Sequence, residues 1–124
     1  MPRVVHFEIS VDEPERAAKF YSDVFGWNSR KWDGPQEYWM ISTGKAPQAG
    51  IDGGMYKRHE GMSFASHVNT IDVPSVDEYV AKVTENGGTL ASPKIAIPGV
   101  GYFAYCRDTE GNMFGIMEGN TNAK

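Results

Sequence analysis

The chain is poor in cysteine, has no long apolar run and carries no excess of positive charge. Its single cysteine, Cys106, cannot form a disulfide within the chain, which is typical of proteins from a reducing compartment. No stretch reaches the roughly 18 apolar residues of a membrane-spanning helix, and the N-terminal MPRVVHFEI enters a strand pattern without an apolar leader. The formal net charge is −4, with basic residues scattered among acidic ones. We therefore expect a cytoplasmic protein with neither membrane nor nucleic-acid partners.

The length and composition are those of one globular domain. The 124 residues are 40% hydrophobic and 23% charged, which is ordinary for a folded domain of this size. No low-complexity segment or long linker interrupts the chain. We therefore predict a single domain over residues 1–124.

A sequence pattern occurs twice in this domain. VVHFEISV from Val4, followed by DEPERAAKFYSDVFGW, is similar to SHVNTIDV from Ser66, followed by PSVDEYVAKVTENGG. The two copies lie about 62 residues apart, which divides the chain into modules of about 1–60 and 61–124. Two copies are too few for a solenoid, so we expect the modules to complete one another around a shared site.

Each copy reads as a strand followed by a helix. Along the first strand apolar and polar residues alternate, which gives the strand one packed and one polar face: Val5, Phe7, Ile9 and Val11 alternate with His6, Glu8 and Ser10. Asp12 is placed to cap the first helix, which Gly26 ends. In the second copy Ser75 and Glu78 form a capping box.

Short strand-like runs follow each helix, so each module is predicted to be a strand, a helix and three strands. The runs are EYWMIST from Glu37, AGIDGGMYK from Ala49, TLASPKIAI, GYFAYCR and NMFGIME. The last two are joined by a turn sequence over residues 108–112.

VVHFEISV-DEPERAAKFYSDVFGW and IPGVGYFAYCRDTEGNMFGIME together resemble the vicinal oxygen chelate superfamily, which includes glyoxalase I, extradiol dioxygenases and bleomycin-resistance proteins. The resemblance covers nearly the whole chain. It implies an α+β fold of two βαβββ modules that form a curved mixed sheet with a concave ligand cup. It also implies a homodimer, and commonly a divalent metal held by the first and last strands of each module. Activity varies widely on this scaffold.

The ligands that the resemblance implies are mostly missing. His6 stands where the family has its first ligand, but Val68 occupies the matching position of the second module. The final ligand falls on Gly115, and its first-module counterpart falls in Gly53-Gly54. Since a bound metal needs about three or four donors, we predict no cofactor.

The alternative is one divalent metal ion held by His6, His67 and Glu118. Strand parity puts His67 on the helix-facing side with Ile71, and only a β-bulge would reverse that side. Parity also makes Glu118 a solvated strand end.

The predicted cup combines polar and apolar side chains around two glycines that leave room for a ligand. The expected ligand contacts are His6, Glu8, Ser10, Tyr38, Met40, Met55, Val68, Thr70, Tyr102, Gly115 and Met117. His6 and Glu8 are also the candidates for acid and base catalysis. Cys106 is expected to be a buried structural thiol, and Lys57-Arg58-His59 a solvated linker.

Three functions are compatible with these residues. The first is binding of a small organic molecule in a metal-free cup, supported by Val68 and the glycines. The second is a metal-dependent lyase, isomerase or dioxygenase, supported by His6. The third is a metal-free enzyme in which Glu8 and His6 transfer protons.

Overall fold

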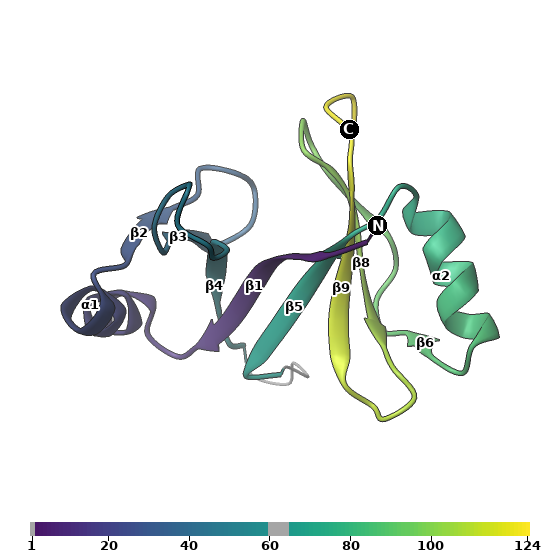
Figure 1. Ribbon diagram of the computed structural model, residues 1–124, viewed down its shortest axis with the longest axis horizontal. Helices are drawn as coiled ribbons and strands as arrows, with labels where there is room; N and C mark the ends of the chain where they lie inside the picture. Colours follow the sequence, from purple (N-terminus) through teal and green to yellow (C-terminus); the bar gives the residue numbers. More distant parts are fainter. Residues whose placement is uncertain (1, 60–64) are drawn as a thin grey trace. The chain divides into compact units, whose positions relative to one another are not determined.

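The computed structural model describes residues 2–59 and 65–124 of the chain. Two helices and nine strands are present in this part of the chain (Figure 1). In chain order they are β1 (Val4–Val11), α1 (Pro14–Phe25), β2 (Asn28–Lys31), β3 (Tyr38–Ser42), β4 (Gly53–Lys57), β5 (His67–Asp72), α2 (Val76–Glu85), β6 (Thr89–Leu90), β7 (Ile95–Ile97), β8 (Gly101–Arg107) and β9 (Met113–Gly119). None of the described helices is long and apolar enough to cross a membrane.

The chain divides into two compact units. Residues His6–Val68 form what we call the N-terminal unit, and Asn69–Lys124 together with the first five residues form the C-terminal unit. The division between the units falls within β5, so the units match the sequence repeat only approximately. The predicted module boundary at residues 60 and 61 lies outside the described residues.

The N-terminal unit is a four-stranded sheet with one helix on it. Its strands are ordered β2-β3-β4-β1; β1 and β4 are parallel, and the other neighbours are antiparallel. The buried core consists of Ile9, Val11, Ile41 and Met55, and Phe7 and Tyr21 pack against it. The predicted orientation of Phe7, Ile9 and Val11 toward the helix is therefore confirmed.

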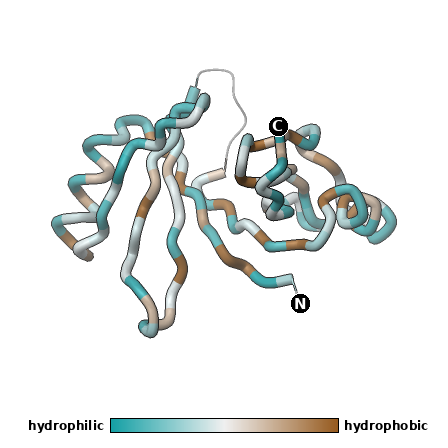
Figure 2. Tube along the Cα trace, turned by 90° about the horizontal axis from the view of Figure 1, so that it is seen from above, coloured by the Kyte–Doolittle hydropathy of each residue, from teal (hydrophilic) through white to brown (hydrophobic). Residues whose placement is uncertain are grey.

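The C-terminal unit repeats this plan. Its strands are ordered β5-β9-β8-β6, with β7 also paired to β8, and β5 and β9 are parallel. The core beneath α2 consists of Val73, Val76, Ala104, Cys106 and Ile116. The α+β class and the βαβββ repeat are confirmed, although the C-terminal unit has the additional short strand β7. Brown and teal segments alternate along several strands, as the period of two requires (Figure 2).

The helix ends agree with the sequence in all but one case. Gly26 ends α1 with a φ of 75°, and Ser75 Oγ accepts a hydrogen bond from Glu78 N at 3.2 Å. The prediction that Asp12 caps α1 is wrong. The capping position is Glu13, whose side chain makes no capping bond, while Asp12 pairs with Arg58.

Two further features of the strands were not predicted. Strand β2 has the sequence NSRK and exposes most of its residues, so it gives no apolar alternation by which a strand could be predicted. The run TLASPKIAI forms two strands, β6 and β7, rather than one. The residues between them include Pro93, which cannot donate a hydrogen bond to a neighbouring strand.

Candidate functional site

One side of the N-terminal unit's sheet carries a group of polar residues. In β1 and β4, Glu8 lies opposite Gly54 and Ser10 opposite Tyr56, and neighbouring residues in register point to the same side of a sheet. Strand β3 adds Tyr38 and Met40 to that side. We call this surface the polar face; it consists of His6, Glu8, Ser10, Tyr38, Met40, Gly54 and Tyr56.

The polar face is substantially buried, although it lies on the side of the sheet away from the helix. Glu8 is 8% exposed and Ser10 only 3% exposed. Acidic side chains are rarely buried to this degree without a structural or functional role. The polar face is therefore the candidate site.

Tyr38 and His6 form the centre of this site. His6 Nε2 and the Tyr38 hydroxyl are 2.7 Å apart, and the two rings stack with centroids 6.4 Å apart at an angle of 20°. A Cβ atom built on Gly54 would overlap the Tyr38 phenol. The expectation that glycine leaves open space for a ligand is therefore wrong at Gly54, because the space holds the ring of Tyr38.

Burial and two carboxylates set the protonation of His6. Burial lowers the pKa of His6 below its usual value, and this effect exceeds the opposing attraction of Glu8 and Asp52. The imidazole is therefore neutral at pH 7, with one ring nitrogen donating and one accepting. Its Nε2 can donate a hydrogen bond to the Tyr38 hydroxyl or accept one from it, depending on the tautomer.

Tyr56 lies at the other end of the polar face. Burial and the nearby charge of Glu8 raise the pKa of Tyr56, while a hydrogen bond with Ser10 and the charge of Arg58 oppose that rise. The phenol is accordingly neutral at physiological pH. Sequence reasoning missed Tyr56, although it lies two residues after Gly54 on the same strand and so shares its side.

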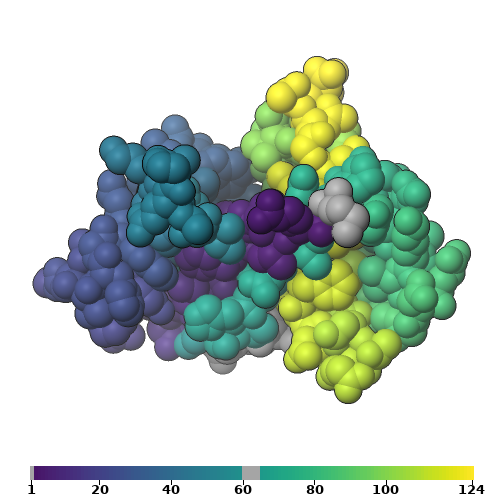
Figure 3. All heavy atoms as spheres, viewed as in Figure 1, coloured from purple at the N-terminus to yellow at the C-terminus, as the bar shows by residue number. Residues whose placement is uncertain are grey.

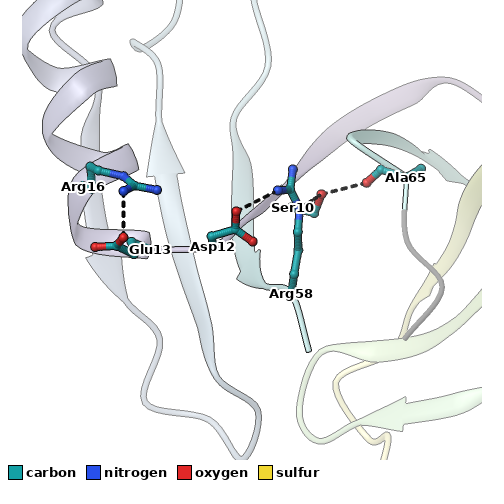
Figure 4. A network of polar contacts seen from close by, with 6 residues as sticks. All are labelled: Ser10, Asp12, Glu13, Arg16, Arg58 and Ala65. Carbon is teal, nitrogen blue, oxygen red and sulfur yellow. Dashed lines mark hydrogen bonds and ion pairs between the residues drawn. The ribbon is translucent and has the colours of Figure 1, made fainter. Parts of the chain in front are cut away.

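Ser10 takes part in a polar network that fixes the end of β1 (Figure 4). Its hydroxyl donates to the carbonyl oxygen of Ala65 at 2.9 Å and accepts from Arg58 Nε at 3.2 Å. Arg58 Nη1 also pairs with Asp12 Oδ2 at 3.2 Å. The Ser10 hydroxyl thus holds the backbone in place, rather than offering a group to a ligand as predicted.

The expectation that residues 57–59 form a solvated linker is wrong at Arg58. Its side chain is 31% exposed, and its backbone N–H donates to Val11 O at 2.8 Å. The sequence around Arg58 gives no sign of these contacts, because Ser10, Val11 and Asp12 are all distant from it in sequence.

Two predicted ligand contacts lie on the wrong side of their strands. Met55 is 0% exposed and belongs to the core beneath α1. Tyr102 packs against the core beneath α2, with Lys94 Nζ 4.9 Å from its ring centroid. Both residues stabilise helix packing, and neither lies on a polar surface.

The remaining predicted contacts lie on the corresponding side of β5 and β9. Thr70 is opposite Gly115, and Asp72 is opposite Met117. A Cβ atom on Gly115 would overlap the ring of Phe103, so this glycine too accommodates an aromatic ring. Thr70 is 3% exposed, and its hydroxyl has no hydrogen-bond partner within the described part of the chain. Val68 precedes Thr70 by two residues on β5 and is 1% exposed.

Each residue of the alternative metal site has a different hydrogen-bond partner. His6 bonds to Tyr38, His67 is exposed with Nδ1 3.4 Å from Ser66 Oγ, and Glu118 Oε1 accepts from Val76 N at 3.0 Å. Glu118 therefore stabilises the start of α2, and the expectation of a solvated strand end is wrong. Within residues 2–59 and 65–124, no three His, Cys, Asp or Glu side chains are grouped so that they could hold a metal. The donor set does not fit the metal that the family implies.

Cys106 lies apart from these polar groups. It is 0% exposed, and burial raises the pKa of its thiol. The predicted structural role agrees with both observations, because a buried neutral thiol is a poor nucleophile.

A small cavity lies in the loop between β3 and β4. Its volume is about 210 Å³, and its walls are residues of the segment 43–52, including Thr43, Lys45, Gln48 and Asp52. The atoms of this loop lie on the surface shown in Figure 3. The charge of Asp52 is also one of the two that oppose the lowering of the His6 pKa.

Comparison with known proteins identifies relatives that cover most of the chain. A family described as bleomycin resistance protein-like N-terminal matches residues 3–44. The glyoxylase-like domain-containing protein of Didymella fabae is 35% identical over 115 residues, covering 88% of each chain. CFP32 of Mycobacterium tuberculosis is 30% identical over 113 residues, which cover 90% of this chain but 42% of CFP32.

Solved structures share the fold at lower identity. A glyoxalase/bleomycin resistance protein/dioxygenase superfamily member from Vibrio splendidus 12B01 has a TM-score of 0.65 and 18% identity, covering 95% of this chain and 99% of that one. Methylmalonyl-CoA epimerase from Mycobacterium tuberculosis has a TM-score of 0.68 and 13% identity, covering 94% and 87%.

Proposed function

Because this chain belongs to the vicinal oxygen chelate superfamily, we propose that it binds a small organic molecule on the polar face of its N-terminal unit. The observation that carries the proposal is a buried carboxylate, Glu8, beside a neutral imidazole that is hydrogen-bonded to a phenol. Polar groups with perturbed pKa values on a shared surface are typical of binding and catalytic sites. The expected contacts are His6, Glu8, Tyr38 and Met40.

We propose that this binding requires no metal ion. Val68, Gly54 and Gly115 stand where relatives of this fold would need donors, and the rings of Tyr38 and Phe103 cover the two glycines. Elemental analysis of the purified protein should find no stoichiometric zinc, iron, manganese or nickel. About one equivalent of any of these, lost in a His6→Ala variant, would overturn this part of the proposal.

A metal-free proton-transfer enzyme is the second candidate. The specific observation is the 2.7 Å contact between His6 Nε2 and the Tyr38 hydroxyl, next to a carboxylate that can accept a proton. Such an arrangement provides an acid and a base within hydrogen-bonding reach of a bound ligand. Deuterium exchange from solvent into a bound carbon acid, lost in Glu8→Gln, would support this candidate over binding alone.

The binding proposal is tested by NMR with a panel of anionic, neutral and cationic small molecules. A ligand should shift the imidazole C–H signals of His6 but leave those of the exposed His67 unchanged. Glu8→Gln should weaken binding while the protein stays folded. A ligand that binds the folded protein without perturbing His6 would place the site elsewhere and overturn the proposal.

We also propose a cytoplasmic homodimer. Helix α1 exposes three large apolar side chains, Phe20, Val24 and Phe25, which a second copy could cover. Light scattering at tens of micromolar should give the mass of a dimer. A monomer mass at that concentration would contradict this expectation.

A further inference from the structure

The loop between β3 and β4 is held in shape by its own hydrogen bonds. At its base, Thr43 N donates to Asp52 Oδ1 at 2.9 Å, and Thr43 Oγ1 donates to Ile51 O at 2.7 Å. Within the loop, Gln48 N donates to Lys45 O at 3.1 Å. Because these bonds fix both the base and the middle of the loop, its cavity is formed before any ligand binds, which lowers the entropic cost of binding.

Small residues keep this cavity open. Half of the residues that line it are glycine or alanine, namely Gly44, Ala46, Ala49 and Gly50, and their side chains are too short to fill it. The volume that remains is about 210 Å³, whereas sites for drug-sized ligands begin at about 300 Å³. The cavity is therefore suited to a smaller molecule.

Opposite charges line the cavity without neutralising each other. Lys45 is its one cationic residue and Asp52 its one anionic residue. Within residues 2–59 and 65–124, neither forms an ion pair with the other or with a third residue. In the same part of the chain the hydrogen bonds of the Asp52 carboxylate all go to Oδ1 and come from Thr43. Both Asp52 Oδ2 and the Lys45 ammonium group are therefore open to a ligand.

We propose that this loop cavity binds a small zwitterion, an amino acid whose ammonium group pairs with Asp52 and whose carboxylate pairs with Lys45. Gln48 also lines the cavity, and its amide can both donate and accept hydrogen bonds. A zwitterion meets an opposite charge at each end, whereas a ligand with one charge leaves either Lys45 or Asp52 unpaired. The site consists of loop residues and includes none of the polar face, so this inference goes beyond the proposed function.

Three probes with the same four-carbon chain test the preference for a zwitterion. 4-Aminobutanoate carries both charges, butanoate carries only the carboxylate, and butylammonium carries only the ammonium group. Binding is followed by the backbone amide NMR signals of residues 43–52. 4-Aminobutanoate should bind about fivefold more tightly than either probe with one charge. Its dissociation constant should be on the order of millimolar, because Lys45 and Asp52 are both exposed to water.

Matched variants locate the two charge pairs. Asp52→Asn retains an oxygen that can accept from Thr43 N but removes the charge, so this variant should bind 4-aminobutanoate no more tightly than butanoate. Lys45→Gln should likewise bind 4-aminobutanoate no more tightly than butylammonium. Lys57 and Asp33 are exposed charged residues of the same unit and provide the controls. Lys57→Gln and Asp33→Asn should leave the binding of 4-aminobutanoate unchanged.

Three results would overturn this inference. Equal affinity of the unmodified protein for 4-aminobutanoate and for either probe with one charge would contradict recognition of a zwitterion. A preference for 4-aminobutanoate that persists in both Asp52→Asn and Lys45→Gln would place the binding site outside the loop. The third result is that no probe, at about 100 mM, produces a saturable shift of the signals of residues 43–52. The proposed function is tested separately through the signals of His6, so the two proposals can fail independently.

Discussion

The two units use the same steric arrangement with different chemistry. Met40 pairs with Gly54 in one unit and Tyr105 with Gly115 in the other. The aromatic residue two positions earlier in each strand, Tyr38 or Phe103, lies over the glycine. In both units, the glycine in the last strand therefore leaves room for an aromatic ring from the neighbouring strand.

The difference between the units is the polar atoms around that ring. In the N-terminal unit the ring carries a hydroxyl that bonds to His6, and Glu8 lies on the same face. The corresponding residues by the repeat spacing are Val68 and Thr70. The repeat thus preserves the packing of the ring, whereas the positions that match His6 and Glu8 carry no ionisable group in the second copy.

On the side of the sheet that faces the helix, the two units should depend equally on their buried apolar side chains. Met55 and Ile116 each follow their glycine and are 0% and 2% exposed, so Met55→Ala and Ile116→Ala should each reduce the free energy of unfolding by about 2–5 kcal/mol. Met40, which is 36% exposed, should lose less than about 1 kcal/mol on change to Ala. Urea unfolding measures all three. If Met40→Ala proves as costly as Met55→Ala, the faces of β3 and β4 have been misassigned.

The glycines should be equally intolerant of a side chain, with different consequences. Gly54→Ala and Gly115→Ala should each reduce the free energy of unfolding by roughly 1–3 kcal/mol, because a ring must move. Only Gly54→Ala should also change the NMR titration of His6, since its displaced ring is the one bonded to the imidazole. An unchanged His6 titration in a folded Gly54→Ala protein would show that the ring and the hydrogen bond are independent.

Much of this packing could be predicted from the sequence, and each wrong prediction has a particular cause. Alternation in β1 correctly assigned Phe7 and Ile9 to the helix side, because one face is apolar and the other polar. Met55 was misplaced because the two glycines before it carry no side chain from which the phase of the strand could be read. Tyr102 was misplaced because β8 is apolar on both sides.

The candidate site was less predictable than the fold. His6, Glu8 and Tyr38 could be identified from strand parity and the resemblance. The contacts of Ser10 with Arg58 join residues 48 positions apart, and no local pattern encodes such a pairing. The ring of Tyr38 over Gly54 is likewise a tertiary contact between strands, so an open space was expected where the structure has a side chain.

Removing one hydroxyl should make the two units more alike. Tyr38→Phe gives the N-terminal unit the same ring as Phe103 and deletes the bond to His6. The free energy of unfolding should fall by about 0.5–1.5 kcal/mol, and ligand-induced shifts of His6 should diminish. Phe20→Tyr, at an exposed position of α1, controls for a change between these ring types. Full ligand response in a folded Tyr38→Phe protein would contradict a role for the hydroxyl.

The smallest effect is a pH dependence confined to the N-terminal unit. The pKa of His6 is lowered in the folded state, so below the unfolded pKa of about 6.5 the unfolded chain binds the proton more readily. The contribution of His6 is thus fully present above pH 6.5 and declines as the pH falls toward the folded pKa. The free energy of unfolding should decrease less between pH 7 and 5 in His6→Gln than in the unmodified protein. An identical pH dependence in His6→Gln and in the unmodified protein would rule out the neutral, buried imidazole.

The polar network at the end of β1 has a consequence for engineering this chain. Arg58 is tied to β1 through Val11 O and Ser10 Oγ, and Ala65 is tied to the same Ser10 hydroxyl. Both ends of the intervening segment are therefore anchored on one short piece of strand, independently of what lies between them. Lengthening a chain segment whose ends are already held together costs little, about 0.6 kcal/mol for each doubling of its length. A reporter peptide inserted between Arg58 and Ala65 should consequently leave the folding of both repeats intact, which makes this connection a natural place to attach a probe.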